Sequence, residues 1–260
     1  RNNVILPVNF VLRHVPIVDV IKGVISSGLL GEPLRAYFEN YATDENLDPD
    51  HWFWDKKKSG GIFIEHGVHF FDLYRYWFGD AEIIWAHTMQ RDSASQEDRV
   101  TCALLHKKTI LATHYHGFDQ PKVLDRQVHQ IIFERGEVTV HGWIPESFSI
   151  KFLADDAVIA DLMRLCPDSH HKILKRFPVV KREMRGRGKK ISAAFYSQID
   201  FYSKTDKQQL YRQAIINLLQ DQIRYLTDPK HHRVIQEENG LEALRLAIQA
   251  SKYAEKDNNS

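Results

Sequence analysis

Three titratable side chains follow a glycine pair at helical spacing. After Gly60 and Gly61 the sequence has Glu65, His69 and Asp72. In an α-helix that begins near Gly61, Glu65 and His69 would lie on one face, and Asp72 would follow within about one further turn. A carboxylate that meets an imidazole fixes its tautomer and holds the other ring nitrogen toward a substrate oxygen. The spacing therefore indicates a general acid–base pair, in which His69 transfers the proton and Glu65 orients the imidazole or binds an adjacent hydroxyl.

Two neighbouring residues bear on this interpretation. His66 is a candidate for substrate contact. On a regular helix its side chain points about 100° around the axis from that of the neighbouring Glu65, so we expect its replacement to affect proton transfer little. Gly67 costs a helix interior about 1 kcal/mol relative to Ala, which suggests close approach of a backbone or a ligand. The alternative is a structural helix, with a solvated Glu–His pair and a core histidine.

This pattern resembles the second-domain signature of the Gfo/Idh/MocA oxidoreductases, the glucose-fructose oxidoreductase and inositol dehydrogenase family. That signature usually has Asp where this sequence has Glu65, which moves the carboxylate about one methylene further out. Residues 8–34 resemble the family's entry strand and first helix, and residues 238–251 resemble its terminal helix. The correspondence covers 4–142 and 205–256. The resemblance implies a substrate-binding domain with His69 and Glu65 at the reacting centre.

The resemblance also implies a dinucleotide-binding domain that this sequence lacks. Family members have an N-terminal Rossmann domain with a Gly-rich turn, and a Glu-Lys-Pro segment whose Lys lies at the reacting centre. The one Gly-x-Gly here, Gly186–Gly188, lies in a basic stretch and has no third Gly. We therefore expect residues 1–256 to be the substrate-binding and oligomerisation domain of a dehydrogenase, with a tail at 257–260 and a divergent region at 143–204.

In that interpretation NAD or NADP binds mainly to the missing Rossmann domain, carried on the same polypeptide or on a separate chain. The substrate would be a sugar, cyclitol or related polyol, oxidised or reduced by hydride transfer, and this chain alone would be inactive. The alternative is a non-catalytic binding or oligomerisation module that retains the fold.

Further substrate contacts are expected from the aromatic and basic segment at 51–58. Indole faces stack on the apolar faces of sugar rings, which suggests Trp54, and an ammonium donates to hydroxyls or phosphate, which suggests Lys58. The alternative is that Trp52 and Trp54 belong to the core. Asp72 is a further candidate for substrate binding, although a structural role is simpler.

Two other groups of residues were weighed as sites. His114 and His116 lie on one face of a predicted strand and, with His66, His69 or His141, could bind zinc. Their spacing lacks a strong zinc motif, so packing or substrate contact is favoured and no metal is expected. Residues 172–190 hold nine basic residues against one acid, but Phe177 is the one aromatic among them, which favours a solvated surface insertion over a nucleic-acid site.

The composition is that of a compact domain. The chain has 260 residues, 43% hydrophobic and 27% charged, with a net charge of +1, which argues against nucleic acid as a partner. Cys102 and Cys166 are too few for a disulfide framework. No apolar run approaches the length of a membrane span. We therefore expect a cytoplasmic protein with no membrane partner.

Periodicity and turn residues predict helices before and after a run of strands. The expected strands are 4–12, 33–43, 82–90, 99–105, 109–117, 127–134, 137–141 and 148–152, and the expected helices are 15–27, 61–78, 206–226 and 237–254. This order predicts an α+β fold, a largely antiparallel open sheet with helices packed on one face. The last six strands read as a meander. With large side chains such as Val140 and Trp143, the other face is expected to join copies into a dimer or tetramer.

Overall fold

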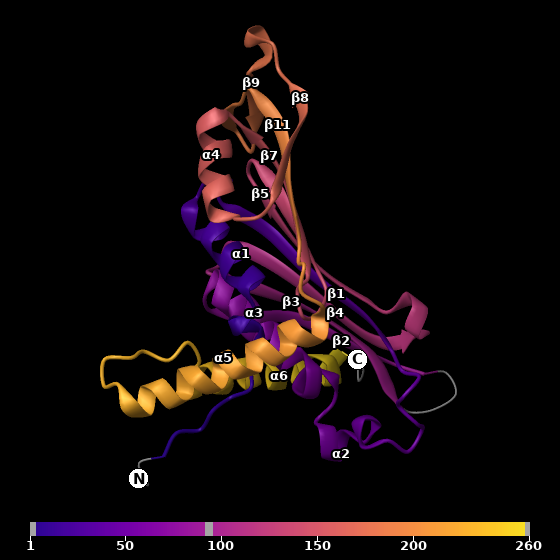
Figure 1. Cartoon of the computed structure of the whole chain (residues 1–260). Helices are drawn as coiled ribbons and strands as arrows, with labels where there is room; N and C mark the ends of the chain where they lie inside the picture. Colours follow the sequence, from indigo (N-terminus) through magenta and orange to yellow (C-terminus); the bar gives the residue numbers. More distant parts are fainter. Residues whose placement is uncertain (1–3, 92–95, 258–260) are drawn as a thin grey trace.

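The computed structural model describes residues 4–91 and 96–257, and it is organised around one large sheet (Figure 1). The strands of this sheet are β1 (Pro33–Thr43), β2 (Ala81–Gln90), β3 (Glu97–His106), β4 (Ile110–Gln120), β5 (Arg126–Phe133), β6 (Gly136–His141), β7 (Ser147–Ala154), β8 (His170–Arg176) and β11 (Phe195–Tyr202). A separate hairpin is formed by β9 (Glu183–Gly186) and β10 (Lys189–Ser192). The helices are α1 (Pro16–Ser27), α2 (Lys56–Ser59), α3 (Val68–Phe78), α4 (Asp156–Leu165), α5 (Lys207–Thr227) and α6 (Glu237–Asp257).

The strand order of the large sheet is β2-β3-β4-β1-β5-β6-β7-β11-β8. The paired strands run antiparallel except β1 and β4, which are parallel. The prediction of an uninterrupted meander was therefore wrong between β4 and β5, where β1 inserts. The inserted strand suits a central position, because Ala36 and Phe38 are fully buried and Asn40 is 1% exposed. The prediction of an α+β fold with a largely antiparallel open sheet is confirmed.

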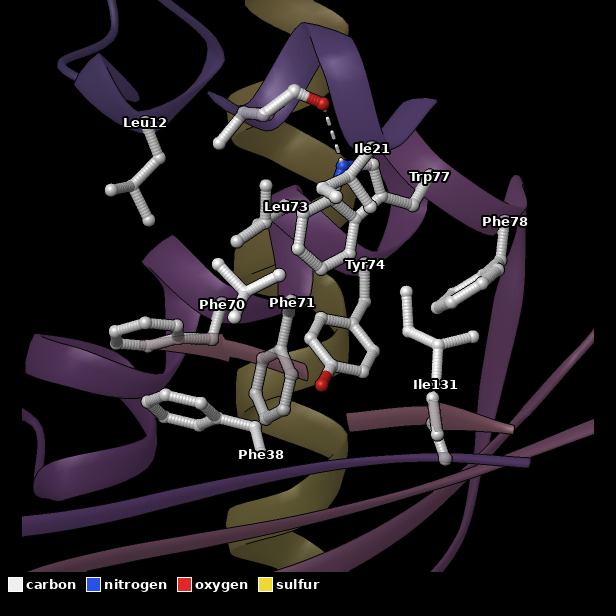
Figure 2. Close-up of a cluster of buried hydrophobic side chains, with 14 of the residues drawn as sticks. Leu12, Ile21, Phe38, Phe70, Phe71, Leu73, Tyr74, Trp77, Phe78 and Ile131 are labelled. Carbon is white, nitrogen blue, oxygen red and sulfur yellow. Dashed lines mark hydrogen bonds between the residues drawn. The ribbon is translucent and has the colours of Figure 1, made fainter. Parts of the chain in front are cut away.

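Helices α1, α3 and α4 cover one face of the sheet (Figure 1). On that face every second residue of β3, β5 and β7 is buried, as the period of a half-covered strand requires. Figure 2 shows aromatic side chains of α3 descending onto β1. Phe70 stacks on Phe38 with ring centroids 3.8 Å apart, and the Tyr74 hydroxyl donates to the carbonyl oxygen of Tyr37 at 2.7 Å. Helix α3 is thus held directly against the central strand β1.

The predicted helix boundaries rest on identifiable caps. Helix α1 begins at Pro16, and Gly28 follows its last residue with φ +66°, the left-handed conformation that glycine adopts readily. The Asp206 side chain accepts the backbone N–H of Gln209 at 3.0 Å and so caps α5. Helix α6 continues to Asp257, so the predicted tail begins later than expected. Its remaining residues, 258–260, lie outside the described part of the chain.

The predicted first strand is wrong. Residues 4–10 carry no regular structure, and a short 3-10 helix, η1 (Val11–His14), follows them. Val4 and Leu6 are 80% and 68% exposed. The backbone N–H of Leu6 donates to the Glu237 carboxylate at 3.1 Å, so this segment meets the start of α6 instead of pairing in the sheet.

The divergent region 143–204 continues the same architecture. It supplies α4, β8 and β11, and strand β11 pairs with β7 and β8 at one end of the sheet. Residues 172–190, expected as a solvated loop, form most of β8 and much of the exposed β9–β10 hairpin. Arg187 and Lys189 of this hairpin form ion pairs with Glu134.

The face of the sheet without helices is polar. A row of Tyr37, Gln130, Thr139 and Ser149 crosses four strands in register. Val140, expected on this face, is fully buried on the opposite one. None of the helices in residues 4–91 and 96–257 has the length and apolarity that a membrane crossing requires.

Candidate functional site

A cavity of about 460 Å³ lies beside the start of α3. Three of its lining residues are ionisable groups of one short segment, namely Glu65, His66 and His69. The other lining residues come from segments far apart in the sequence: Asn9, Val11, Leu12, Asn40, Ala42, Leu47, His51, Trp52, Phe53, Phe70, Phe118, Asp125, Gln127, Trp143, Lys207 and Tyr211. Its volume lies in the range of sites for small organic molecules.

A π-helical turn, η3 (Phe63–Gly67), presents Glu65 and His66 to this cavity, and His69 follows in the first turn of α3. Gly60 and Gly61 lead into η3 with φ of +83° and +88°, and the Glu97 carboxylate of β3 accepts the backbone N–H of Ile62 at 2.9 Å. A π turn holds more residues than an α turn, so successive side chains are separated by a smaller angle. The prediction that His66 points away from the other two was therefore wrong: all three line one cavity.

Gly67 closes this turn. A Cβ atom there would lie 3.2 Å from the Phe71 ring, so the close approach that the sequence suggested is made by an aromatic side chain of the same helix.

Glu65 and His69 share the cavity, but no hydrogen bond joins their side chains in the described structure. Burial raises the pKa of the Glu65 carboxyl and lowers the pKa of the His69 imidazole. The His69 ring meets the Phe10 ring edge-on at 5.9 Å between centroids. His69 is therefore held in its neutral form, in which one ring nitrogen can accept a proton.

His66 lies beside His116. Its Nδ1 lies 3.0 Å from Nδ1 of His116 on β4. His116 is fully buried, and burial lowers the pKa of both imidazoles well below the usual value. The sequence grouped these two histidines only as possible zinc ligands, and the structure joins them directly through their ring nitrogens.

Three predicted site residues lie outside the cavity. Asp72 is 1% exposed and forms a two-pronged ion pair with Arg13, at 2.6 and 2.8 Å, which ties η1 to α3. The Trp54 indole N–H donates to the carbonyl oxygen of Leu47 at 3.2 Å. The Lys58 side chain is 65% exposed and lies 3.5 Å from Asp55.

Lys207 and Trp143 are cavity residues that the sequence reasoning missed. Lys207 is the first residue of α5, and its ammonium lies 5.9 Å from the centre of the Trp143 ring. A cation in the first turn opposes the helix dipole, and this is the sequence signal that could have marked Lys207. Trp143 also packs edge-on against Tyr211, with centroids 5.4 Å apart, so it does not lie on the open sheet face.

The floor of the cavity is formed by polar residues of the central strands. Asn40 of β1 faces Gln127 of β5 and His116 of β4 in register. Within residues 4–91 and 96–257, no group of three or more His, Cys, Asp or Glu side chains is arranged to hold a metal ion.

Comparison with known proteins finds a family that part of this chain resembles. Residues 18–139 match the family model described as the GFO/IDH/MocA C-terminal domain. This part of the chain is therefore similar to a C-terminal domain of the Gfo/Idh/MocA family. The matched region includes η3, α3 and the strands β1 to β5, and so most of the cavity's ionisable residues.

The proteins to which this chain is similar are longer than it. The scyllo-inositol 2-dehydrogenase (NAD(+)) of Bacillus subtilis (strain 168) is 36% identical over 83 residues, 32% of this chain and 22% of that protein. Levoglucosan dehydrogenase in complex with NADH and levoglucosan has a TM-score of 0.70 at 13% identity, covering 98% of this chain and 66% of that chain. An oxidoreductase from Agrobacterium radiobacter in complex with NAD+, L-tartaric acid and magnesium has a TM-score of 0.65 at 14% identity, covering 98% and 64%. At these identities the solved structures show the fold, and this chain spans less than two thirds of each.

The residues of this chain do not fit a dinucleotide fingerprint. Gly186 and Gly188 flank the turn of the β9–β10 hairpin, whereas the fingerprint joins a strand to a helix whose N-terminus holds the pyrophosphate. The solved structures of the Agrobacterium radiobacter oxidoreductase and of levoglucosan dehydrogenase contain NAD+ and NADH respectively.

Proposed function

We propose that this chain is the substrate and assembly domain of an NAD(P)-dependent oxidoreductase that acts on a sugar, cyclitol or related polyol. The observation that carries the proposal is the cavity itself, which combines Glu65, His66 and His69 with aromatic side chains such as Trp52 and Trp143. Aromatic faces pack on the apolar faces of sugar rings, and the polar groups bind hydroxyls. The names of the relatives, which include an inositol dehydrogenase and a levoglucosan dehydrogenase, support the same substrate class.

His69 transfers the proton in this proposal. The nicotinamide, when bound, exchanges a hydride with the carbinol carbon of the substrate. The neutral His69 imidazole accepts the hydroxyl proton during oxidation and returns it during reduction. Burial favours this neutral form because it lowers the His69 pKa, so the base is available at neutral pH.

Glu65 and Lys207 bind the remaining oxygens of the substrate. Burial raises the Glu65 pKa, which favours a carboxyl group that hydrogen-bonds a hydroxyl over one that forms an ion pair with His69. Lys207 reaches the cavity from α5 and donates to a neighbouring hydroxyl. Asp72 has a structural role, since both of its carboxylate oxygens are bonded to Arg13.

The proposal extends to the setting of the enzyme. A Rossmann domain, on the same polypeptide or on a separate chain, supplies the dinucleotide site, and copies of this domain associate through the open sheet face. A reducing cytoplasm is the proposed compartment, which the two buried free cysteines, Cys102 and Cys166, support.

The test is steady-state kinetics of the complete enzyme, this domain together with its dinucleotide-binding domain, on a panel of cyclitols and sugars with NAD and NADP. His69→Ala should lower kcat/KM by about 10²-fold or more, the scale of general acid–base catalysis, and leave nicotinamide affinity nearly unchanged. Glu65→Gln should cost less, because it keeps the shape of the side chain. Lys58→Ala is the control, because Lys58 lies outside the cavity.

Two results would contradict the proposal. Undiminished turnover by the His69→Ala enzyme would remove His69 from the proton transfer. Absence of turnover on every substrate, with either cofactor, would favour a non-catalytic binding or oligomerisation module.

A further inference from the structure

We propose that His116 is a positioning residue that locks His66 in the tautomer with its proton on Nε2, so that His66 presents a fixed N–H donor to the cavity. The identity of the acceptor, an oxygen of the bound polyol, rests on the proposed function. The tautomer itself follows from the contacts of the two rings.

The first step is the distance between the rings. The two Nδ1 atoms lie 3.0 Å apart, which is a hydrogen-bond length. A neutral imidazole has one protonated nitrogen and one with a free lone pair. The contact therefore needs a proton on one Nδ1 and a lone pair on the other, and the two rings must be opposite tautomers.

The second step decides which ring donates. His116 Nε2 is buried and has no hydrogen-bond partner. If its proton were on Nε2, a buried N–H would be left unsatisfied while Nδ1 took up the bond, and an unsatisfied buried donor costs free energy that the other tautomer avoids. With the proton on Nδ1, the single N–H of His116 is used in the bond to His66. His116 is therefore the donor, and His66 Nδ1 is the acceptor.

The third step follows for the free nitrogen of His66. Its proton must lie on Nε2, because Nδ1 accepts from His116. His66 lines the cavity, and in the described structure its Nε2 has no protein partner. The ring therefore offers a permanent N–H donor to a ligand oxygen, and it cannot act as a base from that nitrogen.

In this arrangement the two cavity histidines, His66 and His69, have different roles. Within residues 4–91 and 96–257 no hydrogen bond is made by the ring nitrogens of His69, so no contact there fixes its tautomer and it can accept or donate a proton. His66 instead donates its N–H to an oxygen of the substrate. That oxygen is either the reacting oxygen as it becomes a carbonyl or the oxygen of an adjacent hydroxyl. A fixed neutral donor stabilises negative charge on oxygen without having to lose its proton.

The test is nuclear magnetic resonance of the full chain with 15N-labelled histidine, using long-range correlations between the ring protons and nitrogens. We expect a protonated, pyrrole-type Nε2 and an unprotonated, pyridine-type Nδ1 in His66, and the reverse in His116. A protonated Nδ1 in His66 would overturn the inference. The measurement needs no turnover, so a failure of the proposed dehydrogenase function would leave its result intact.

Matched variants test whether His116 is the donor. His116→Phe keeps a ring at the position but removes the N–H, so the bridging proton resonance should disappear and the 15N shift of His66 Nδ1 should change. His114→Phe is the control, because His114 is equally buried on the same strand but makes no hydrogen bond to His66. Persistence of the bridging resonance in His116→Phe would contradict the proposal. Should that variant fail to fold, the wild-type tautomers decide the question.

Discussion

At the scale of single residues, the least expected feature is a group of buried histidines under the helices. His106, His114, His116 and His129 are all fully buried, and each has at least one ring nitrogen without a partner. Aromatic rings surround them: His114 lies 4.4 Å from Tyr74 and His129 lies 4.6 Å from Phe38, between centroids. These histidines serve as flat, neutral packing groups beside the polar cavity.

This packing makes stability depend on pH. Burial lowers the pKa of His106 to about 4 and of His129 to about 3, whereas an unfolded histidine has a pKa of about 6.5. Between these values the unfolded chain binds more protons, so stability is full above about pH 6.5 and is lost as pH falls toward the folded pKa values. Each such histidine contributes up to about 1.36 kcal/mol per pH unit in that window.

We therefore expect His129→Phe to reduce the slope of unfolding free energy against pH by about 1.4 kcal/mol per unit between pH 6 and pH 4. Urea unfolding at several pH values measures this slope. The exposed His170 provides the control, and His170→Phe should leave the slope unchanged. An equal slope in wild type and His129→Phe would show that His129 does not stay neutral in the folded chain.

At the scale of elements, the sequence predicted those that carry local signals. Helix α1 has Pro16 at its start and Gly28 after its end, α5 has the Asp206 cap, and both form where these residues place them. The strands β3, β5 and β7 alternate as expected. Val4–Leu12 also looks like a strand locally, but whether a strand forms depends on a partner, and this segment meets α6 instead.

The cavity could be predicted only in part for the same reason. Glu65, His66 and His69 come from one segment, so their proximity is local. The backbone N–H of Ile62, at the start of the π turn, donates to Glu97, which is 35 residues away in sequence. Lys207 and Trp143 reach the cavity through tertiary packing, which no spacing along the chain encodes.

Gly136, the first residue of β6, allows a direct test of sheet packing. A Cβ atom there would lie 2.3 Å from the backbone oxygen of Lys151 on β7, so Gly136→Ala must push two strands apart. We expect a loss of about 1–3 kcal/mol of unfolding free energy, the usual cost of overpacking, measured by urea unfolding.

Gly23 in α1 is the matched control for that substitution. A Cβ atom at Gly23 would meet the Leu165 side chain at an ordinary 3.9 Å, so Gly23→Ala should stabilise the chain by about 0.5–1 kcal/mol through helix propensity. If both substitutions changed stability in the same direction, the strand contact at Gly136 would not be the cause.

At the scale of the whole molecule, the cavity and the open sheet face are separate surfaces. The cavity is lined by Glu65, His66 and His69, and none of its described lining residues belongs to a phosphate-binding turn. We therefore expect the isolated chain to show no measurable affinity for NAD or NADP by titration calorimetry, and no dehydrogenase turnover. The complete enzyme provides the positive control. Tight binding of either dinucleotide by the isolated chain would show that it has a cofactor site without the Gly-rich phosphate-binding turn.

We expect the open sheet face, crossed by the row of Tyr37, Gln130, Thr139 and Ser149, to join copies of the isolated chain, because the helices cover the other face. Light scattering at micromolar concentration should give a dimer or tetramer. Thr139→Arg places a charge in the middle of this row and should shift the mass toward the monomer, while Lys57→Glu on the exposed α2 should not. A wild-type monomer would contradict the prediction.

The insertion of β1 between β4 and β5 has a consequence for the nascent chain during synthesis. A ribosome releases β1 long before its two partners, since Tyr37 and Gln130 are 93 residues apart in sequence. Until both arrive, Phe38 and its neighbours cannot complete the middle of the sheet, and pairings across such long separations form slowly. A translational pause or a truncation before β5 therefore leaves β1 exposed with one edge unpaired. Chains with such an exposed apolar strand are the ones that chaperones bind and that aggregate when chaperones are scarce.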